Sequence, residues 1–103
     1  MDGFIAVAKV GDLNLGEMKM VEADGEAILL ANVNGEIHAV SDICSHAGAS
    51  LSDGLLEGQE IECPLHGNRY NVITGAYLDG PGPEDIPRYT VQIDGEIIFV
   101  GPA

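Results

Sequence analysis

The chain has 103 residues, of which 46% are hydrophobic and 20% are charged, and its formal net charge at pH 7 is −13. A chain of this length buries roughly two-thirds of its unfolded surface and is expected to form one domain, residues 1–103, without a separate catalytic module. The excess of 17 acidic over 4 basic residues repels nucleic-acid phosphates and anionic membranes, so neither is an expected partner, whereas basic docking faces are favoured. An acidic surface that serves solubility alone is the alternative interpretation of this charge.

The N-terminal sequence carries no recognisable targeting signal. Residues 1–9 lack the basic start followed by an apolar run that a secretory signal requires. No apolar stretch in the chain approaches the ~20 residues that a membrane-spanning helix needs. We therefore expect a soluble, cytoplasmic protein.

Short runs of apolar and β-branched residues alternate with turn dipeptides along the chain. No segment sustains the 3.6-residue period of a helix, so an all-β fold is predicted. Asn-Gly and Asp-Gly dipeptides accept the positive φ angles of tight hairpin turns. Two hairpins are predicted first: residues 18–22 and 26–30 joined by Asp24-Gly25, and residues 27–33 and 36–40 joined by Asn34-Gly35.

A second group of short strands is predicted between residues 61 and 78, with Thr74-Gly75 as a turn. Because this group interrupts the series of hairpins, it is interpreted as an inserted subdomain. Residues 44–78 are the candidate bounds of this inserted subdomain.

Pro81-Gly82-Pro83 interrupts the predicted strands and is interpreted as a loop that could act as a lid. The last predicted element follows this proline loop. It is a hairpin in which Asp94-Gly95 joins residues 89–93 to residues 96–100.

The strongest functional signal comes from two cysteines and two histidines that occur as two mixed pairs. Cys44-Ser45-His46 is followed, after sixteen residues, by Cys63-Pro64-Leu65-His66, and the chain has no other cysteine. A structural disulfide does not require a histidine beside each cysteine, so metal ligation is the better interpretation. Glycines near both pairs predict tight loops whose N–H groups can approach inorganic sulfide: Gly48, Gly54, Gly58 and Gly67.

The composition of each pair distinguishes two kinds of metal centre. A Cys2His2 zinc site usually places like ligands together, as C-x(2–4)-C and H-x(3–5)-H. Here each pair offers one thiolate and one imidazole, which suits a [2Fe–2S] cluster with two sulfurs on one iron and two nitrogens on the other. A Cys2His2 zinc-binding interaction module remains the alternative from another functional class.

The pattern C-x-H, x16, C-x-x-H, with Pro64 inside the second pair and Gly67 after it, resembles the Rieske-type [2Fe–2S] ferredoxin family over nearly the whole chain. The resemblance implies the Rieske-like fold, an antiparallel β-sandwich with a small inserted cluster-binding subdomain, and one Rieske-type [2Fe–2S] cluster. It also implies four ligand roles: Cys44 and Cys63 on the inner iron, and His46 and His66 on the outer iron near the surface.

Neighbouring positions suggest which branch of the family the chain resembles. Ala49 and Leu65 stand where respiratory Rieske proteins carry a disulfide between the two loops, and Asn68 replaces their serine. These differences favour a low-potential ferredoxin. Tyr70 stands where many oxygenase ferredoxins carry Phe, and a hydroxyl near a cysteine sulfur would raise the potential. The surroundings expected for the cluster are Gly67, Asn68, Tyr70 and Pro81.

The chain is similar to the ferredoxin components of bacterial systems that dioxygenate aromatic hydrocarbons. This implies a carrier of single electrons from an NAD(P)H-dependent flavoprotein reductase to a terminal oxygenase. The carrier would not be an enzyme, because oxygen activation needs an iron site with two histidines and one carboxylate. Once His46 and His66 bind the cluster, the only other histidine in the chain is His38, which lies in a predicted strand. We expect a monomer that docks briefly through the surface around these two ligands and Pro81, with interfaces often below ~1,200 Å².

A small Rieske-like subunit of a nitrite reductase would share the expected fold. The four retained ligands, Cys44, His46, Cys63 and His66, argue against it. Proteins that co-purify with the chain would discriminate between the two functions.

Overall fold

The computed structural model describes residues 3–43, 50–64, 67–80 and 84–101. Within these ranges the chain consists of β-strands, tight turns and two 3₁₀ helices of three residues each, and no helix there is long and apolar enough to cross a membrane. The elements in chain order are β1 (Ile5–Lys9), η1 (Val10–Asp12), β2 (Met18–Ala23), β3 (Glu26–Val33), β4 (Glu36–Ser41), η2 (Leu51–Asp53), β5 (Leu55–Glu57), β6 (Glu60–Glu62), β7 (Arg69–Asn71), β8 (Tyr77–Asp79), β9 (Arg88–Asp94) and β10 (Ile97–Gly101).

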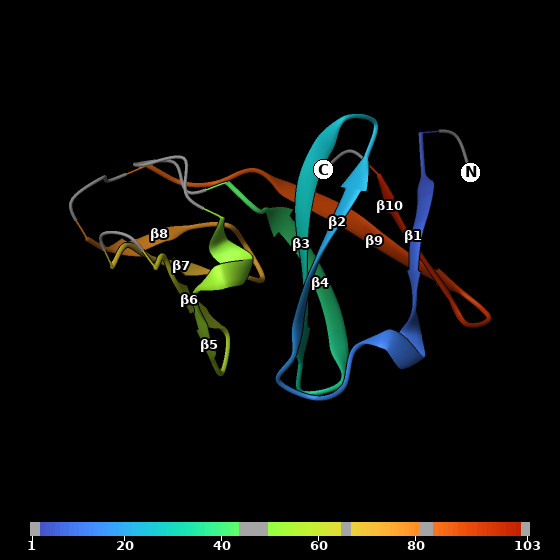
Figure 1. The fold of residues 1–103 in the computed structure, drawn as a ribbon, viewed down its shortest axis with the longest axis horizontal. Helices are drawn as coiled ribbons and strands as arrows, with labels where there is room; N and C mark the ends of the chain where they lie inside the picture. The colour runs from blue at the N-terminus through green and yellow to red at the C-terminus, as the bar shows by residue number, and fades with distance from the viewer. Residues whose placement is uncertain (1–2, 44–49, 65–66, 81–83, 102–103) are drawn as a thin grey trace.

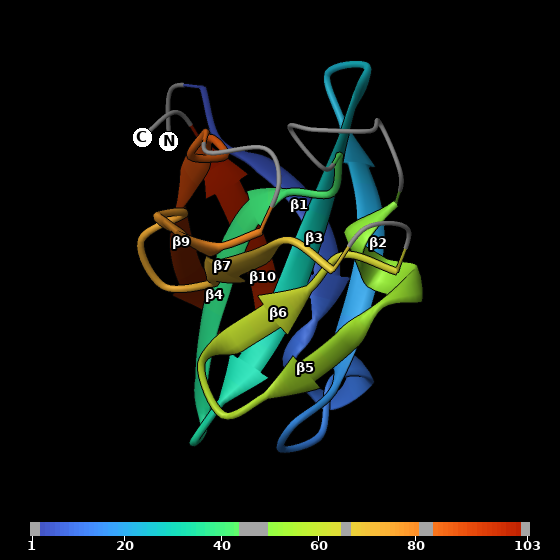
Figure 2. The same ribbon diagram turned by 90° about the vertical axis from the view of Figure 1, so that its left-hand side faces the viewer.

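The strands form two antiparallel sheets, which lie side by side in Figure 1 and one behind the other in Figure 2. The large sheet has the order β1-β10-β9-β4-β3-β2, and its two edge strands, β1 and β2, contact each other, so the sheet curls over its own core. The small sheet has the order β5-β6-β7-β8 and lies between β4 and β9 in the chain. The predicted all-β sandwich with a small inserted sheet is confirmed.

Strand β3 lies between two hydrophobic clusters and is buried on both faces. Alternate side chains of a strand point to opposite faces, and accordingly Leu29 and Ala31 belong to one cluster whereas Ile28 and Leu30 belong to the other. The first cluster includes side chains of the small sheet and fills the space between the two sheets. The continuous apolar run of β3 therefore connects the core of the large sheet to the inserted sheet.

Both N-terminal hairpins have the turns that the sequence predicts. Asp24 and Gly25 have φ angles of 54° and 81°, and Asn34 and Gly35 have 54° and 92°, as a type I′ turn requires. The strand pairs on either side, β2 with β3 and β3 with β4, are antiparallel along their full length.

The prediction for the C-terminal hairpin is wrong by one residue. Asp94 pairs with Ile97, so the two-residue turn consists of Gly95 and Glu96 rather than Asp94 and Gly95. Gly95 has a φ of 63°, and among the described residues outside glycine positive φ occurs only at Asp24 and Asn34. A glycine at the first central position is typical of a type II′ turn, which accepts an ordinary residue such as Glu96 at the second.

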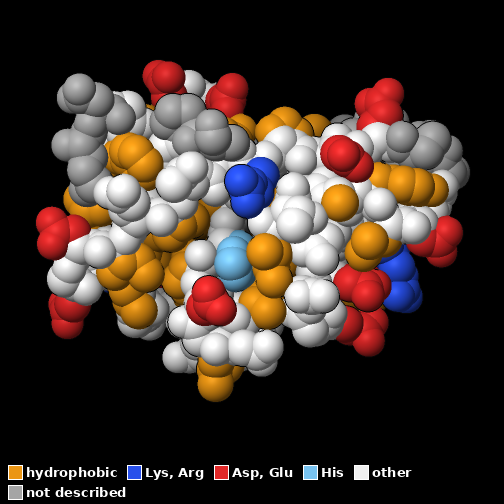
Figure 3. Space-filling view, turned by 180° about the vertical axis from the view of Figure 1, so that it is seen from behind, with side chains coloured by type: hydrophobic (Ala, Val, Ile, Leu, Met, Phe, Trp, Pro, Cys, Tyr) orange, Lys and Arg blue, Asp and Glu red, His pale blue; other side chains and the backbone are white. Residues whose placement is uncertain are grey.

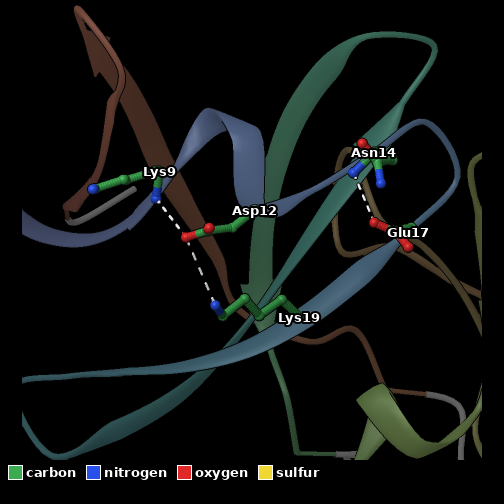
Figure 4. Close-up of polar contacts among 5 residues, drawn as sticks. All are labelled: Lys9, Asp12, Asn14, Glu17 and Lys19. Carbon is green, nitrogen blue, oxygen red and sulfur yellow. Dashed lines mark hydrogen bonds and ion pairs between the residues drawn. The ribbon is translucent and has the colours of Figure 1, made fainter.

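The segment before β2 has structure that the hairpin signals did not predict. Strand β1 pairs with β10 and leads into η1, where the carboxylate of Asp12 accepts a hydrogen bond from the Lys9 N–H at 3.0 Å. The same carboxylate oxygen lies 3.8 Å from Nζ of Lys19 on β2 (Figure 4). Further along, the Asn14 N–H donates to the Glu17 carboxylate at 2.8 Å. These contacts hold the β1–β2 connection at the edge of the large sheet.

Candidate metal centre

Cys63 is the predicted ligand that the structure describes. It follows β6 directly, is 1% exposed, and belongs to the hydrophobic cluster between the two sheets. The other three predicted ligands, Cys44, His46 and His66, lie outside the described residues, as does Pro81. The site is therefore built from Cys63 and from the segments that hold the two ligand loops.

The second ligand loop is closed at its base by backbone hydrogen bonds. The Cys63 N–H donates to the Asn68 carbonyl at 2.7 Å, and the Gly67 N–H donates to the Cys63 carbonyl at 3.2 Å. Gly67 has a φ of 76°, in the left-handed region that glycine tolerates best. The loop is thus the tight end of the β6–β7 hairpin, as the flanking glycine predicts.

The first ligand loop is closed by Asp42, a residue that the sequence analysis does not single out. Asp42 is 2% exposed, and its carboxylate accepts a hydrogen bond from the Ser50 hydroxyl and another from the Ser52 N–H at 2.8 Å. The Asp42 carbonyl accepts from the Leu51 N–H at 2.6 Å, and Ile43 forms a β-bridge with Ser50. Asp42 therefore joins the two ends of the segment that carries Cys44 and His46.

The bases of the two loops pack against the same core. Leu51, which follows the first loop, belongs to the same cluster as Cys63, which begins the second. Gly54 lies so close to the end of β6 that a Cβ on Gly54 would be 1.9 Å from the Glu62 carbonyl oxygen. Only glycine permits this approach, so the two ligand-bearing segments are held together by one hydrophobic cluster and one backbone contact.

Cys63, Asn68 and Tyr70 share the buried face of the β6–β7 hairpin. Ile61 pairs with Tyr70, and the Cys63–Asn68 hydrogen bond continues the same ladder by two residues. Side chains on one face of such a ladder are neighbours. Asn68 and Tyr70 are both 0% exposed, and the Asn68 side-chain amide donates to the Tyr70 hydroxyl at 3.0 Å.

The opposite face of this hairpin is exposed to solvent and charged. Arg69 lies between Asn68 and Tyr70 in the chain, and its guanidinium is 3.2 Å from the Glu62 carboxylate and 3.6 Å from that of Glu60. The alternation of buried and exposed residues therefore separates the ligand side of the hairpin from its ionic side.

The start of the proline loop packs against Asn68. Gly80 has a φ of 128°, and a Cβ at this position would lie 2.4 Å from the Asn68 Oδ1. The Tyr77 hydroxyl donates to the Gly80 carbonyl at 2.5 Å and so holds this glycine in place. The structure thus brings three of the predicted surrounding residues, Gly67, Asn68 and Tyr70, into one hairpin.

His38, which the sequence assigns to a strand rather than to the site, lies in β4 of the large sheet. It pairs with Ala31 of β3 and is partly buried. The interpretation of His38 as a strand residue is confirmed.

The donor set fits a [2Fe–2S] cluster. Cys63, the one predicted ligand among the described residues, has almost no solvent exposure, and Gly67, four residues later, has a positive φ. A thiolate in such a place requires compensation by a bound cation and by hydrogen-bond donors. The sequence supplies a second cysteine and two histidines near it and Cys63, and two thiolates with two imidazoles is a donor set that suits a cluster with unequal iron sites.

The two-sheet fold and the paired Cys/His loops define a Rieske-type protein, and comparison with known proteins agrees. The model of the Rieske [2Fe–2S] domain family matches residues 3–90. The chain belongs to this family, which confirms the resemblance carried by the ligand motifs and gives the protein one Rieske-type [2Fe–2S] cluster.

Relatives and solved structures cover almost the whole chain. The ferredoxin component of the naphthalene 1,2-dioxygenase/salicylate 5-hydroxylase systems of Ralstonia sp is 44% identical over 91 residues, which is 88% of each protein. The ferredoxin of carbazole 1,9a-dioxygenase from Nocardioides aromaticivorans IC177 is 34% identical, with a TM-score of 0.93 over 99% of this chain and 100% of that one. A ferredoxin solved in complex with the reduced oxygenase of carbazole 1,9a-dioxygenase is 29% identical, with a TM-score of 0.91 over 98% and 94% of the two chains.

Proposed function

We propose that this protein is a soluble ferredoxin that carries single electrons from an NAD(P)H-dependent flavoprotein reductase to a terminal oxygenase acting on aromatic compounds. The observation that carries the proposal is the match with the ferredoxin of a carbazole 1,9a-dioxygenase over 99% of this chain and 100% of that one. The bound cluster supplies reversible one-electron chemistry at a potential of about −150 to +300 mV. A carrier that exchanges electrons with NAD(P)H-dependent enzymes is expected in the cytoplasm.

In this proposal Cys44 and Cys63 hold the inner iron, and His46 and His66 hold the outer iron. Cys63 is buried among the hydrophobic side chains between the two sheets, which supports the inner position for the iron that the thiolates bind. The neutral imidazoles at the outer iron then form the edge at which electrons enter and leave. The chain's own contribution is to hold both loops against one core, so that little reorganisation accompanies electron transfer.

The surface beside the ligand loops has apolar side chains suited to brief docking. Ile43 at the start of the first loop and Leu78 on β8 are each 45% exposed. Among the charged side chains the acidic ones predominate: on the face shown in Figure 3 they occupy both ends and much of the rim, while basic side chains cover little. This combination suits a partner with an apolar contact area surrounded by basic groups.

The related ferredoxin solved with its oxygenase supports a terminal oxygenase as the electron acceptor. We propose that this protein binds its reductase and its oxygenase one at a time, as a monomer, through the surface around His46, His66 and Pro81. Such transient electron-transfer contacts are small, often below about 1,200 Å².

Stopped-flow spectroscopy of the loaded protein tests this function in two steps. A flavoprotein ferredoxin reductase with NAD(P)H should bleach the visible absorption of the oxidised protein, and an oxidised Rieske-type terminal oxygenase should then restore it within the turnover time of the system. Substrate hydroxylation by the oxygenase should require this protein. A protein that is reduced but passes no electron to any oxygenase would contradict the proposal, and co-purification with nitrite reductase subunits would favour that alternative.

A further inference from the structure

A buried amide and a buried hydroxyl form a closed pair beside the cysteine ligand. The Asn68 Nδ2 donates to the Tyr70 hydroxyl oxygen at 3.0 Å, and neither residue is exposed. Residues at positions i and i+2 of a strand point to the same face. Since the Cys63 N–H bonds to the Asn68 carbonyl, that face is also the one that carries Cys63.

The direction of this hydrogen bond constrains the tyrosine proton. A phenol oxygen accepts through its lone pairs and carries a single proton. Because the Asn68 amide donates to this oxygen, the Tyr70 proton points away from Asn68 toward another acceptor. A donated hydrogen bond also polarises the hydroxyl, which strengthens the bond that the hydroxyl itself makes.

We propose that Asn68 is a positioning residue that raises the reduction potential of the cluster by acting through the Tyr70 hydroxyl. The amide orients and polarises the hydroxyl as a donor toward the cluster sulfurs. Hydrogen bonds to the sulfurs favour the reduced cluster because it carries the extra negative charge. The inference rests on the proposed ligand set, and it adds that Asn68 and Tyr70 act as one unit.

The backbone around Asn68 keeps its amide in place. Gly80 lies so close that a Cβ would be 2.4 Å from the Asn68 Oδ1 and 2.7 Å from its Cα. The Tyr77 hydroxyl, 2.5 Å from the Gly80 carbonyl oxygen, fixes this glycine. An amide held by close packing on one side and by the Tyr70 hydroxyl on the other is pre-organised, which is what a positioning role requires.

A double-mutant cycle measured as reduction potentials tests the proposal. Protein-film voltammetry is applied to the cluster-loaded parent, Asn68→Ala, Tyr70→Phe and the double variant. Each single substitution should lower the ratio of reduced to oxidised protein at a fixed potential by at least about threefold, which is about 28 mV for one electron. The double variant should match Tyr70→Phe alone, because Asn68 then has no hydroxyl to orient.

Asn32→Ala is the matched control. Asn32 is also a buried asparagine, and its amide donates to the Leu13 carbonyl at 3.1 Å in the core of the large sheet. This substitution should lower stability and leave the potential unchanged. If Asn68→Ala does not retain its cluster, Asn68→Leu, which keeps the side-chain volume and removes the amide, is used in the same cycle.

The proposal is overturned if the Asn68 substitution leaves the potential unchanged, or if it lowers the potential equally with and without the Tyr70 hydroxyl. Equal shifts would mean that the amide acts on the cluster independently of Tyr70. These outcomes are separate from the electron-carrier proposal. If no electrons pass between reductase and oxygenase, the electron-carrier function is refuted, but the reduction potentials of the double-mutant cycle still test Asn68. If the two substitutions have additive effects on the potential, only the proposed role of Asn68 is refuted.

Discussion

The backbone N–H of Cys63 donates to the carbonyl oxygen of Asn68 at 2.7 Å, so the buried cysteine, a predicted ligand, and the buried asparagine lie opposite each other at the end of the β6–β7 hairpin. This pairing places the thiolate on the same face as the Asn68–Tyr70 hydrogen bond. The register of a short hairpin therefore decides which polar groups surround the ligand. A slip of one residue would turn Arg69 toward the cluster and Tyr70 toward solvent.

Replacing Tyr70 with Phe should lower the reduction potential by roughly 30–60 mV. The hydroxyl stabilises the reduced cluster by a fraction of a charged hydrogen bond, about 0.7–1.4 kcal/mol, and a one-electron couple shifts by about 59 mV for each tenfold change. Protein-film voltammetry measures the shift. Tyr89→Phe is the control, because its hydroxyl bonds to Glu26 at 2.6 Å in the large sheet. A Tyr70→Phe potential equal to that of the parent would show that the hydroxyl does not reach the sulfurs.

Replacing Asp42 with Ala should open the base of the first ligand loop. The buried carboxylate accepts from Ser50 and Ser52 on the far side of the loop, and losing both bonds is expected to cost about 2–4 kcal/mol. For a domain of this size, the temperature at which half of the visible absorption is lost should fall by about 10 °C or more. Iron content per chain should fall as well.

Asp42→Asn provides the matched comparison. The amide oxygen can still accept from the Ser52 N–H, but the amide nitrogen cannot accept from the Ser50 hydroxyl. The loss of stability should be smaller than for Asp42→Ala. Equal stability of the parent and Asp42→Ala would show that the loop base does not depend on this carboxylate.

The pKa of Tyr89 predicts a change at alkaline pH. Burial is the largest cause, and the hydrogen bond to Glu26 and the charge of that carboxylate add to it; together they raise the pKa from 10.0 to about 12. Because the raised pKa stabilises the protonated phenol in the folded protein, this contribution to stability is complete below about pH 10 and is lost between pH 10 and 12. The pKa of Tyr89 is measured from the phenolate absorbance after a rapid pH jump, with the Tyr89→Phe curve subtracted.

Glu26→Gln tests the cause of this shift. Removing the carboxylate charge should lower the pKa of Tyr89, while burial, the largest cause, should keep it above 10.0. The absorbance difference at pH 11 should therefore be larger in Glu26→Gln than in the parent. A Tyr89 titration near pH 10 in the parent would contradict the assigned environment.

The hairpins could be predicted because two Asx-Gly dipeptides impose positive φ angles at fixed positions. The register of the last hairpin could not be predicted in this way. In Asp94-Gly95-Glu96 the glycine can take either the first or the second central position of a two-residue turn, and the pairing of the two strands decides which one it takes. Strand β1 was missed because it forms no hairpin with β2, the next strand along the chain. Its place depends on pairing with β10, from the other end of the chain.

The Rieske-type cluster could be predicted from the spacing of the cysteines and histidines and the resemblance that it carries, whereas the assignment of each ligand stays a prediction. Asp42 could not, because its partners Ser50 and Ser52 meet it only when the loop between them closes. The Asn68–Tyr70 hydrogen bond also depends on the tertiary fold. The i, i+2 spacing indicates one face, but the burial of both residues against the core between the sheets follows from how the small sheet packs.

The net charge predicts a salt dependence of electron transfer. If the charge of −13 steers the protein toward a basic partner, the second-order rate constant for reduction by the reductase should fall as ionic strength rises. Asp79→Asn, in the exposed end of β8 before Gly80, should weaken this dependence more than Asp94→Asn, in the turn region of β9 and β10 at the other end of the molecule (Figure 1). Stopped-flow rates that stay constant across a salt series would reject steering.

The most direct test of the central claim is iron and acid-labile sulfide analysis combined with pulsed EPR of the dithionite-reduced protein. One Rieske-type cluster held by Cys44, Cys63, His46 and His66 predicts about two irons and two sulfides per chain. It also predicts two strongly coupled nitrogen nuclei, one of which is lost when His66 is replaced by Cys. A colourless zinc protein without sulfide, or a reduced cluster with no nitrogen coupling, would contradict the claim.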